Sequence, residues 1–218
     1  EARTLATFRH PHIVRVARFF EANNTAYMVL EYERGESLKN WWRKHADAPE
    51  VELLGLFGPL LDGLAVVHEA GFLHRDIKPD NIYVRDGDGS LVLLDFGAAR
   101  RAAEEQTDAS NVVTPGYGPI EQYVMGEQGP YTDLYAFGAT LYWMVTGKKP
   151  AAAPDRMVFP DPMTPAVEAG KGRYSEAFLK AVDWALAPES KDRPRDVAEF
   201  RAALDAAVAS LCPTPLSR

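Results

Sequence analysis

The sequence predicts an α+β fold in which a small mixed segment is followed by a mostly helical body. Two stretches, 13–20 and 26–32, are rich in β-branched and aromatic residues, which is typical of strands. From residue 37 onward, longer stretches with helix start and stop signals dominate the chain. With 218 residues and 46% hydrophobic composition, the chain is long enough to bury a sizeable core.

The first part of the chain is expected to form a helix and an antiparallel strand pair. Residues 1–9 have a helical composition, and the turn-like run 21–25 separates the two expected strands. A two-stranded hairpin alone is marginally stable in water. We therefore expect the hairpin to depend on neighbouring structure.

The body of the chain contains several expected helices. Ser37 is a candidate N-cap for a short helix. A longer helix is expected to follow, although Pro59 and three glycines interrupt its pattern. Residues 133–146 are apolar nearly all round, which indicates a helix buried in the middle of the domain. The longer helix is expected over 51–70, and two further helices are expected over 174–187 and 195–210.

A short hairpin is expected inside this helical body. Strands over 83–85 and 91–94 flank a turn-forming run that begins at Asp86. A calcium loop starting at Asp86 would need Gly at its sixth position and Glu at its twelfth, where this chain has Leu91 and Gly97. The run is therefore a turn and not a calcium site. Residues 101–111 are polar without periodicity and are expected to form a loop.

Charge and cysteine content argue against several classes of protein. The formal net charge of −7 disfavours non-specific binding to nucleic acid or to anionic membranes. The single cysteine, Cys212, is typical of a reducing compartment, so we expect a cytoplasmic protein or a cytoplasmic domain of a membrane-anchored one. The longest strongly apolar run, 134–145, is shorter than the roughly 20 residues that a membrane helix needs.

One short motif concentrates chemically useful side chains. Residues 74–81 read H-R-D-I-K-P-D-N, and D-F-G follows at 95–97. This order supplies a candidate base, a cation and two oxygen ligands suited to Mg²⁺, namely Asp76, Lys78, Asn81 and Asp95. Each residue alone would more often lie on a solvated surface. A strand, a turn and a second strand between Asn81 and Asp95 are the structural context that the combination requires.

The chain resembles the protein kinase family, whose signatures include H-R-D-x-x-x-x-N and D-F-G. The resemblance implies a protein-kinase-like fold with a truncated N-terminal lobe over 1–33, a mostly helical C-terminal lobe over 34–211 and a tail over 212–218. It also implies ATP and Mg²⁺ as cofactors.

The resemblance assigns a role to each residue of the motif. Asp76 would accept or orient the substrate hydroxyl, and Lys78 would offset the charge of the γ-phosphate. Asn81 and Asp95 would hold the Mg²⁺ ion.

The end of the family's activation segment is also recognisable. Residues 114–121 read T-P-G-Y-G-P-I-E, similar to the form found in bacterial kinases that resemble eukaryotic ones. By this resemblance Glu121 pairs with Arg193, where the alternative is two weakly interacting surface charges. Lys78 and Thr114 together imply serine and threonine acceptors on protein substrates. Asp133 would hold the backbone of the catalytic loop, with a simple N-cap role as the alternative.

Regulation by phosphorylation is a further expectation from the resemblance. Arg75, joined by Arg100, would receive a phosphate through charge-assisted hydrogen bonds. Ser110 matches the usual phosphosite, and Thr107 and Thr114 are alternatives. Ordinary loop hydroxyl groups remain the competing interpretation.

The nucleotide site is expected at the segment that follows the second strand. By resemblance Leu30 is the gatekeeper, and the main chain at Glu31 and Glu33 binds adenine. Ser37 is a candidate ribose contact, with the helix N-cap as the alternative. The resemblance also places Tyr83 among the nucleotide-binding residues.

Two signatures of the family do not occur in these 218 residues. No glycine-rich loop precedes Leu30, and Glu1 aligns with the helix glutamate whose lysine partner belongs to an earlier strand. We therefore expect a piece of a longer kinase that turns over little ATP alone, because losing one charge-stabilising donor commonly lowers the rate by about 10² to 10³. Sensor or membrane domains are possible neighbours in the full protein.

Two other functions compete with this interpretation. A pseudokinase-like protein-binding scaffold is disfavoured by the intact set of Asp76, Lys78, Asn81 and Asp95. A small-molecule phosphotransferase is disfavoured by the segment 114–121, which the resemblance ties to protein substrates.

Overall fold

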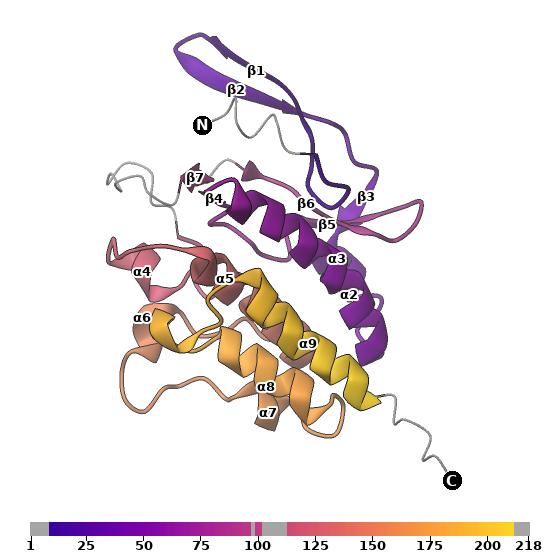
Figure 1. The fold of residues 1–218 in the computed structure, drawn as a ribbon, viewed down its shortest axis with the longest axis vertical. Coiled ribbons are helices and arrows are strands. Elements are labelled where there is room, and N and C mark those ends of the chain that lie inside the picture. Colours follow the sequence, from indigo (N-terminus) through magenta and orange to yellow (C-terminus); the bar gives the residue numbers. More distant parts are fainter. Residues whose placement is uncertain (1–8, 97–98, 102–112, 212–218) are drawn as a thin grey trace.

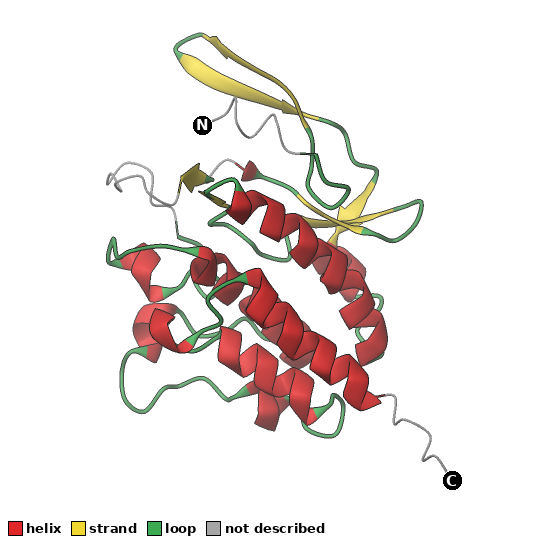
Figure 2. Ribbon diagram, in the orientation of Figure 1, coloured by secondary structure: helices red, strands yellow, loops and turns green. Residues whose placement is uncertain are grey.

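The computed structural model describes residues 9–96, 99–101 and 113–211. Its short strands lie at one end and its helices form the larger part of the molecule (Figure 1). Coloured by secondary structure, the same view shows that the strands are confined to the part nearest the N-terminus and to the junction with the helices (Figure 2). The predicted α+β arrangement is therefore present.

The first two strands form the predicted antiparallel hairpin. Strand β1 (Val16–Ala22) pairs with β2 (Thr25–Leu30), and the register runs from the Val16↔Leu30 pair to the Ala22↔Thr25 pair. Asn23 and Asn24 make the turn with φ values of 51° and 58°, a conformation that asparagine tolerates better than most residues. The predicted turn over 21–25 is thus too long, because the two asparagines alone reverse the chain.

A small three-stranded sheet lies between the hairpin and the helices. Its order is β3 (Gly35–Ser37), β5 (Ile82–Arg85) and β6 (Leu91–Leu93), all antiparallel. The β5–β6 hairpin was predicted, whereas β3 was not, because Gly-Glu-Ser has no strand pattern of its own. A Cβ atom at Gly35 would lie 2.0 Å from the Val84 carbonyl oxygen, so glycine allows this close pairing.

A two-residue strand overlaps the first residue of the expected loop. Strand β7 (Arg100–Arg101) pairs with β4 (Phe72–Leu73), so the prediction of a loop beginning at Arg101 is wrong at that residue. The rest of that loop lies outside the described residues. A two-residue strand carries no sequence pattern, and here the pairing with β4 creates it.

The helices predicted from residue 37 onward are present, with ends shifted by up to three residues, whereas the helix predicted over 1–9 lies almost entirely outside the described residues. Helix α5 begins at Pro130, three residues before the predicted start, because Pro130 occupies its first turn and Gly129 is its N-cap. The helices are α2 (Leu38–Trp42), α3 (Glu50–Glu69), α4 (Ile120–Tyr123), α5 (Pro130–Thr146), α6 (Ala153–Arg156), α7 (Ala166–Ala169), α8 (Glu176–Ala185) and α9 (Val197–Leu211), with a 3₁₀ turn over Ser190–Asp192.

Helix α5 is the centre of the helical body, as its sequence predicts. The ring of Phe137 makes edge-to-face contacts with Phe57 of α3 at 5.4 Å and with Phe200 of α9 at 6.0 Å between centroids. A Cβ atom at Gly138 would lie 2.7 Å from the Ala185 methyl group, so glycine lets α5 and α8 approach closely. The buried helix gives the loops at its N-terminal end a rigid support.

By length and composition alone, α3 is apolar enough to cross a membrane. Half of its most apolar window is buried inside the fold, where α3 packs against α9, β4 and β6. Residues 134–145 form a longer uninterrupted apolar run, because Asp62 and the acidic residues at both ends interrupt the apolar run of α3. Burial on this scale is typical of the core helix of a globular domain.

Candidate functional site

The loop over residues 74–81 is held in place by the buried carboxylate of Asp133. Asp133 lies in the first turn of α5 and accepts hydrogen bonds from the main-chain N–H groups of His74 and Arg75, each at 2.8 Å. The Nε2 atom of His68 donates to the same carboxylate at 2.8 Å. Arg75 has a φ of 68°, a conformation that costs a residue other than glycine about 1–3 kcal/mol. The carboxylate therefore stabilises a strained loop.

The Asp133 carboxylate remains ionised although its side chain is fully buried. Burial alone would raise its pKa, but the hydrogen bond from His68, the nearby imidazoles and the main-chain donor at Arg75 hold the pKa of Asp133 below its ordinary value. Gly129 is the N-cap of α5, so the alternative that Asp133 is a simple N-cap is wrong.

His74 joins this loop to the D-F-G segment. Its Nε2 atom donates to the Leu94 carbonyl oxygen at 2.8 Å, while Nδ1 accepts from the Asp76 N–H at 3.3 Å. The imidazole contacts the Phe96 ring with centroids 4.6 Å apart. Burial lowers the pKa of His74, and the neutral ring fits one donated and one accepted bond.

The buried His74 predicts a loss of stability in mild acid. Its folded pKa is lower than its ordinary value of 6.5, so the unfolded chain takes up a proton that the folded chain does not. Stability is therefore full above about pH 6.5 and falls as the pH drops below it. Urea unfolding at pH 7.5 and 5.5 should show a smaller pH-dependent loss in His74→Gln than in the wild type.

His10 provides the matched control for this experiment. Partial burial also lowers the pKa of His10, so His10→Gln should reduce the pH-dependent loss in the same direction but by less. Equal losses in the wild type and His74→Gln would contradict the assignment of the effect to His74.

The predicted base and cation lie together with a threonine. Lys78 Nζ is 2.7 Å and 2.9 Å from the two carboxylate oxygens of Asp76 and donates to Thr114 Oγ1 at 3.1 Å. The Thr114 hydroxyl donates to Asp76 Oδ1 at 2.7 Å. Three residues whose roles were assigned separately thus form one hydrogen-bonded cluster. A carboxylate held in this way is fixed in orientation, as a base that takes a hydroxyl proton has to be.

Asn81 and Asp95, the two predicted Mg²⁺ ligands, lie on segments that a main-chain hydrogen bond joins. Asn81 uses its amide nitrogen to donate to Asp76 Oδ2 at 2.8 Å and to the Asp76 carbonyl oxygen at 2.9 Å. This arrangement leaves the amide oxygen of Asn81 for a ligand. The Leu94 N–H donates to the Asn81 carbonyl oxygen at 2.8 Å, which brings the exposed Asp95 next to Asn81. One carboxylate and one amide oxygen fit Mg²⁺, which completes its shell with phosphate and water oxygens.

The predicted pair between Glu121 and Arg193 is present and buried. Arg193 Nη1 lies 2.8 Å and Nη2 3.2 Å from the two carboxylate oxygens of Glu121. The guanidinium also donates to the Ala187 and Pro188 carbonyl oxygens and lies over the Tyr135 ring. Removing one partner of a buried charge pair is strongly destabilising, because the other charge is left buried without a partner. The pair fixes α4, and with it the segment that begins at Thr114.

Several supporting residues were missed by sequence reasoning. Gln122 donates to the Arg75 carbonyl oxygen at 3.0 Å, and Thr132 donates to Glu121 at 3.0 Å. His68 and Arg85 also escaped notice. Among these residues, only Gln122 had a sequence signal, because it follows Glu121 in the motif. The hydrogen-bond partners of Thr132, His68 and Arg85 lie far away in the sequence.

The segment after β2 places the predicted nucleotide-binding residues in line. Leu30 is partly buried and pairs with Val16, and the Glu31 N–H donates to the Arg15 carbonyl oxygen at 2.9 Å. Within the described part of the chain, the Glu31 carbonyl and the Glu33 N–H have no intramolecular hydrogen bond. These two groups are therefore open to an adenine edge.

The other two predicted nucleotide contacts lie on neighbouring strands. Ser37 accepts a hydrogen bond from the Asn40 N–H at 3.3 Å and is the N-cap of α2, which is the alternative left open for it. Tyr83 is the register partner of Ser37 and is partly buried. The two residues therefore lie side by side on one face of the small sheet.

Several predicted residues fall where little is described. Glu1, Thr107 and Ser110 lie outside the described residues. Arg100 is described only through its backbone in β7. Their proposed roles in nucleotide binding and phosphorylation stay predictions.

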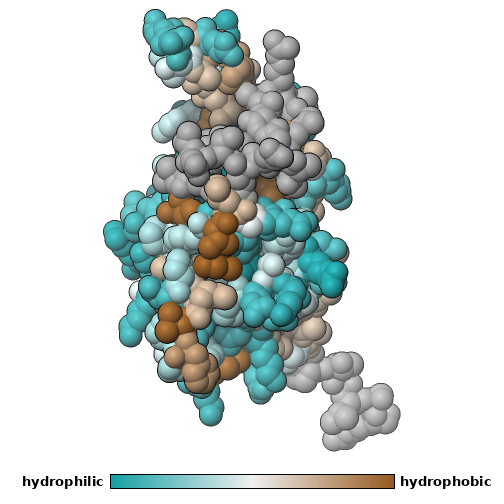
Figure 3. Space-filling model, turned by 90° about the vertical axis from the view of Figure 1, so that its left-hand side faces the viewer, coloured by the Kyte–Doolittle hydropathy of each residue, from teal (hydrophilic) through white to brown (hydrophobic). Residues whose placement is uncertain are grey.

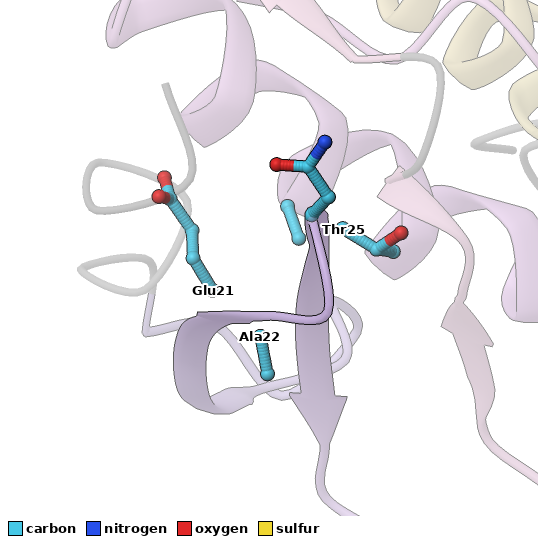
Figure 4. A pocket seen from close by; sticks show the side chains of 5 residues that line it. Glu21, Ala22 and Thr25 are labelled. Atoms are coloured by element: carbon cyan, nitrogen blue, oxygen red, sulfur yellow. The ribbon is translucent and has the colours of Figure 1, made fainter.

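One surface hollow lies at the tip of the first hairpin. Figure 4 shows Glu21, Ala22 and Thr25 around the turn, and Asn24 and Ala26 complete the lining. None of the predicted site residues lines it. The hollow is therefore separate from the cluster around Asp76.

Comparisons with known proteins agree with this geometry. Residues 1–196 match the family model described as "Protein kinase domain". Serine/threonine-protein kinase pkn2 of Myxococcus xanthus is 34% identical over 161 residues, which are 71% of this chain and 19% of that protein. Serine/threonine-protein kinase PknA of Nostoc sp. is 37% identical over 139 residues, which are 61% of this chain and 24% of that protein.

A solved structure extends the similarity to three dimensions. The structure titled "PpkA-294 apo form" is 39% identical, covers 93% of this chain and 72% of its own, and has a TM-score of 0.80. The first curated relatives are longer proteins, of which this chain spans 19% to 38%.

Proposed function

Because the chain belongs to the protein kinase family, we propose that the protein transfers the γ-phosphoryl group of ATP to serine and threonine hydroxyl groups of protein substrates. The match to the family model and the similarity to the PpkA-294 structure confirm the predicted fold. The proposal concerns the activity of the whole protein, because this chain spans only part of the length of its curated relatives.

The cluster of Asp76, Lys78 and Thr114 is the single observation that carries the proposal. Asp76 accepts the proton of the attacking hydroxyl or orients that hydroxyl toward the phosphorus atom. Lys78, held 2.7 Å from Asp76, carries the positive charge that the transferred phosphoryl oxygens require. Thr114 fixes both side chains in one geometry.

Asn81 and Asp95 would hold the metal ion that family members use with ATP. Bound Mg²⁺ would supply positive charge between the phosphates. The protein contributes the positions of the two ligands, because Asn81 is anchored through its nitrogen to the Asp76 loop and Asp95 follows the main-chain bond from Leu94.

Protein substrates are favoured by the surface beside the site. Figure 3 shows the face that carries α4 and α6, where apolar side chains are exposed among polar ones. The large apolar residues exposed directly after α4 are Val124 and Met125, and those exposed directly after α6 are Met157, Val158 and Phe159. Apolar surface of this kind suits contact with another polypeptide better than with a small polar molecule.

We place this chemistry in the cytoplasm. Ser110 or Thr107 is the candidate phosphosite, and Arg75 would bind its phosphate.

The test is phosphate transfer by the full-length protein from radiolabelled ATP to peptide mixtures containing serine, threonine or tyrosine. We expect label on serine and threonine only, and loss of label when EDTA removes the metal. Label on tyrosine, or on an aminoglycoside instead of the peptides, would refute the proposed acceptor class. Absence of any transfer would refute the enzymatic proposal and leave a binding scaffold.

A further inference from the structure

We infer that Arg85 is a positioning residue for the nucleotide, because its guanidinium binds the Glu33 side chain and ties it to two other segments. The inference rests on the proposed function, since it assumes that the main chain at Glu31 and Glu33 binds adenine. Arg85 itself is on β5, after the catalytic loop, and has no place in the phosphate-transfer cluster.

The Arg85 side chain makes hydrogen bonds to three separate segments of the chain. Its Nε and Nη2 atoms donate to the two carboxylate oxygens of Glu33, each at 2.7 Å. Its Nη1 atom donates to the Pro11 carbonyl oxygen at 2.7 Å and to Ser90 Oγ at 3.3 Å. One side chain thereby joins the turn before β1, the segment after β2 and the β5–β6 hairpin. A planar guanidinium suits this task because its donors have fixed directions.

The segment from Glu31 to Arg34 has few other attachments. The Glu31 N–H is bound to the Arg15 carbonyl oxygen, and the Arg34 carbonyl accepts from the Asp86 N–H at 3.1 Å. Between these two points the Tyr32 side chain is 88% exposed and gives no packing. The Glu33 side chain is therefore the anchor that fixes the orientation of the Glu33 peptide, whose N–H has no intramolecular hydrogen bond within the described residues.

A second pair in the same region offers a natural comparison. Arg15 and Glu31 form an ion pair at 2.8 Å, but their side chains are 52% and 49% exposed. The Arg85 and Glu33 side chains are only 24% and 18% exposed. Exposed pairs contribute little because water and salt screen them, whereas partly buried bidentate pairs hold their geometry. Of these two pairs, only Arg85–Glu33 is therefore expected to affect nucleotide binding.

The experiment compares Arg85→Met with Arg15→Met in the full-length protein. Binding of a fluorescent ATP analogue and steady-state kinetics are measured with ATP and peptide varied separately. We expect Arg85→Met to raise the Kd and the KM for ATP by about fivefold or more, with kcat at saturating ATP and the KM for peptide nearly unchanged. Arg15→Met should leave all four quantities at wild-type values. Arg85→Lys keeps the charge but loses the fork, so its effect should be intermediate.

The outcomes separate this inference from the proposed function. A wild-type protein that fails to bind the ATP analogue refutes the proposed function and the inference together. A wild-type protein that binds, with Arg85→Met equal to Arg15→Met, refutes the inference alone. Parallel loss of kcat and of binding would show a merely structural role and also refute it. If Arg85→Met does not fold, Glu33→Gln, which keeps the side-chain size, must show the same selective rise in the KM for ATP.

Discussion

Replacing Asp133 with alanine is expected to lower the free energy of unfolding by about 3–5 kcal/mol and to abolish phosphate transfer. The substitution removes the acceptor for the His74 and Arg75 main-chain N–H groups and for the His68 imidazole, all at 2.8 Å. Buried donors without an acceptor are costly, and Arg75 would no longer be held at its positive φ.

Asp62→Ala is the matched control for this measurement. Asp62 forms an ion pair with Arg201 at 2.8 Å, but its side chain is 56% exposed, so its loss should change stability by about 1 kcal/mol or less. Urea unfolding followed by circular dichroism measures both variants. A loss in Asp133→Ala no larger than that in Asp62→Ala would show that the loop does not depend on the carboxylate.

Asp76→Asn is expected to lower kcat by about 10² to 10⁴ while stability and the affinity for ATP stay close to wild type. Asparagine has the shape of aspartate and still accepts from Lys78 or Thr114, but it cannot accept the proton of the substrate hydroxyl. The measurement is single-turnover phosphate transfer, together with nucleotide binding.

The neighbouring Asp80 provides the control for Asp76→Asn. Asp80 belongs to the same loop, but it pairs with Lys39 at the surface and its side chain is 48% exposed. Asp80→Asn should therefore leave kcat within about twofold of wild type, as expected for a surface pair. A kcat of Asp76→Asn in the same range would remove Asp76 from its proposed role.

Local sequence patterns predicted the elements that depend on local causes. The hairpin at residues 16–30 follows from β-branched residues on both sides of an asparagine turn, and α5 follows from an apolar run that ends before Gly147, although its start at Pro130 was predicted three residues too late. The motif at residues 74–81 also places Asp76, Lys78 and Asn81 on one loop, where the structure brings them into hydrogen-bonding contact.

Contacts made across long sequence distances were beyond this kind of prediction. Arg85 meets Glu33 across 52 residues, and His68 meets Asp133 across 65 residues. Neither pair shares a helix face or a strand register, so no periodicity marks it. Strand β7 was missed for the same reason, since it is defined by its pairing with Phe72 and Leu73 and has no sequence pattern of its own. The Glu121–Arg193 pair was predicted only because both residues stand in recognisable motifs.

The packing of α3 against α9 has a consequence for the synthesis of the chain. Arg201 of α9 donates to the Gly58 carbonyl oxygen of α3 at 2.7 Å across 143 residues of sequence. A ribosome adding about 5–20 residues per second needs on the order of ten seconds between these two positions. During that interval the apolar face of α3 has no α9 to cover it. The nascent chain therefore exposes this apolar face until α9 has been synthesised, and apolar surface exposed in this way promotes aggregation.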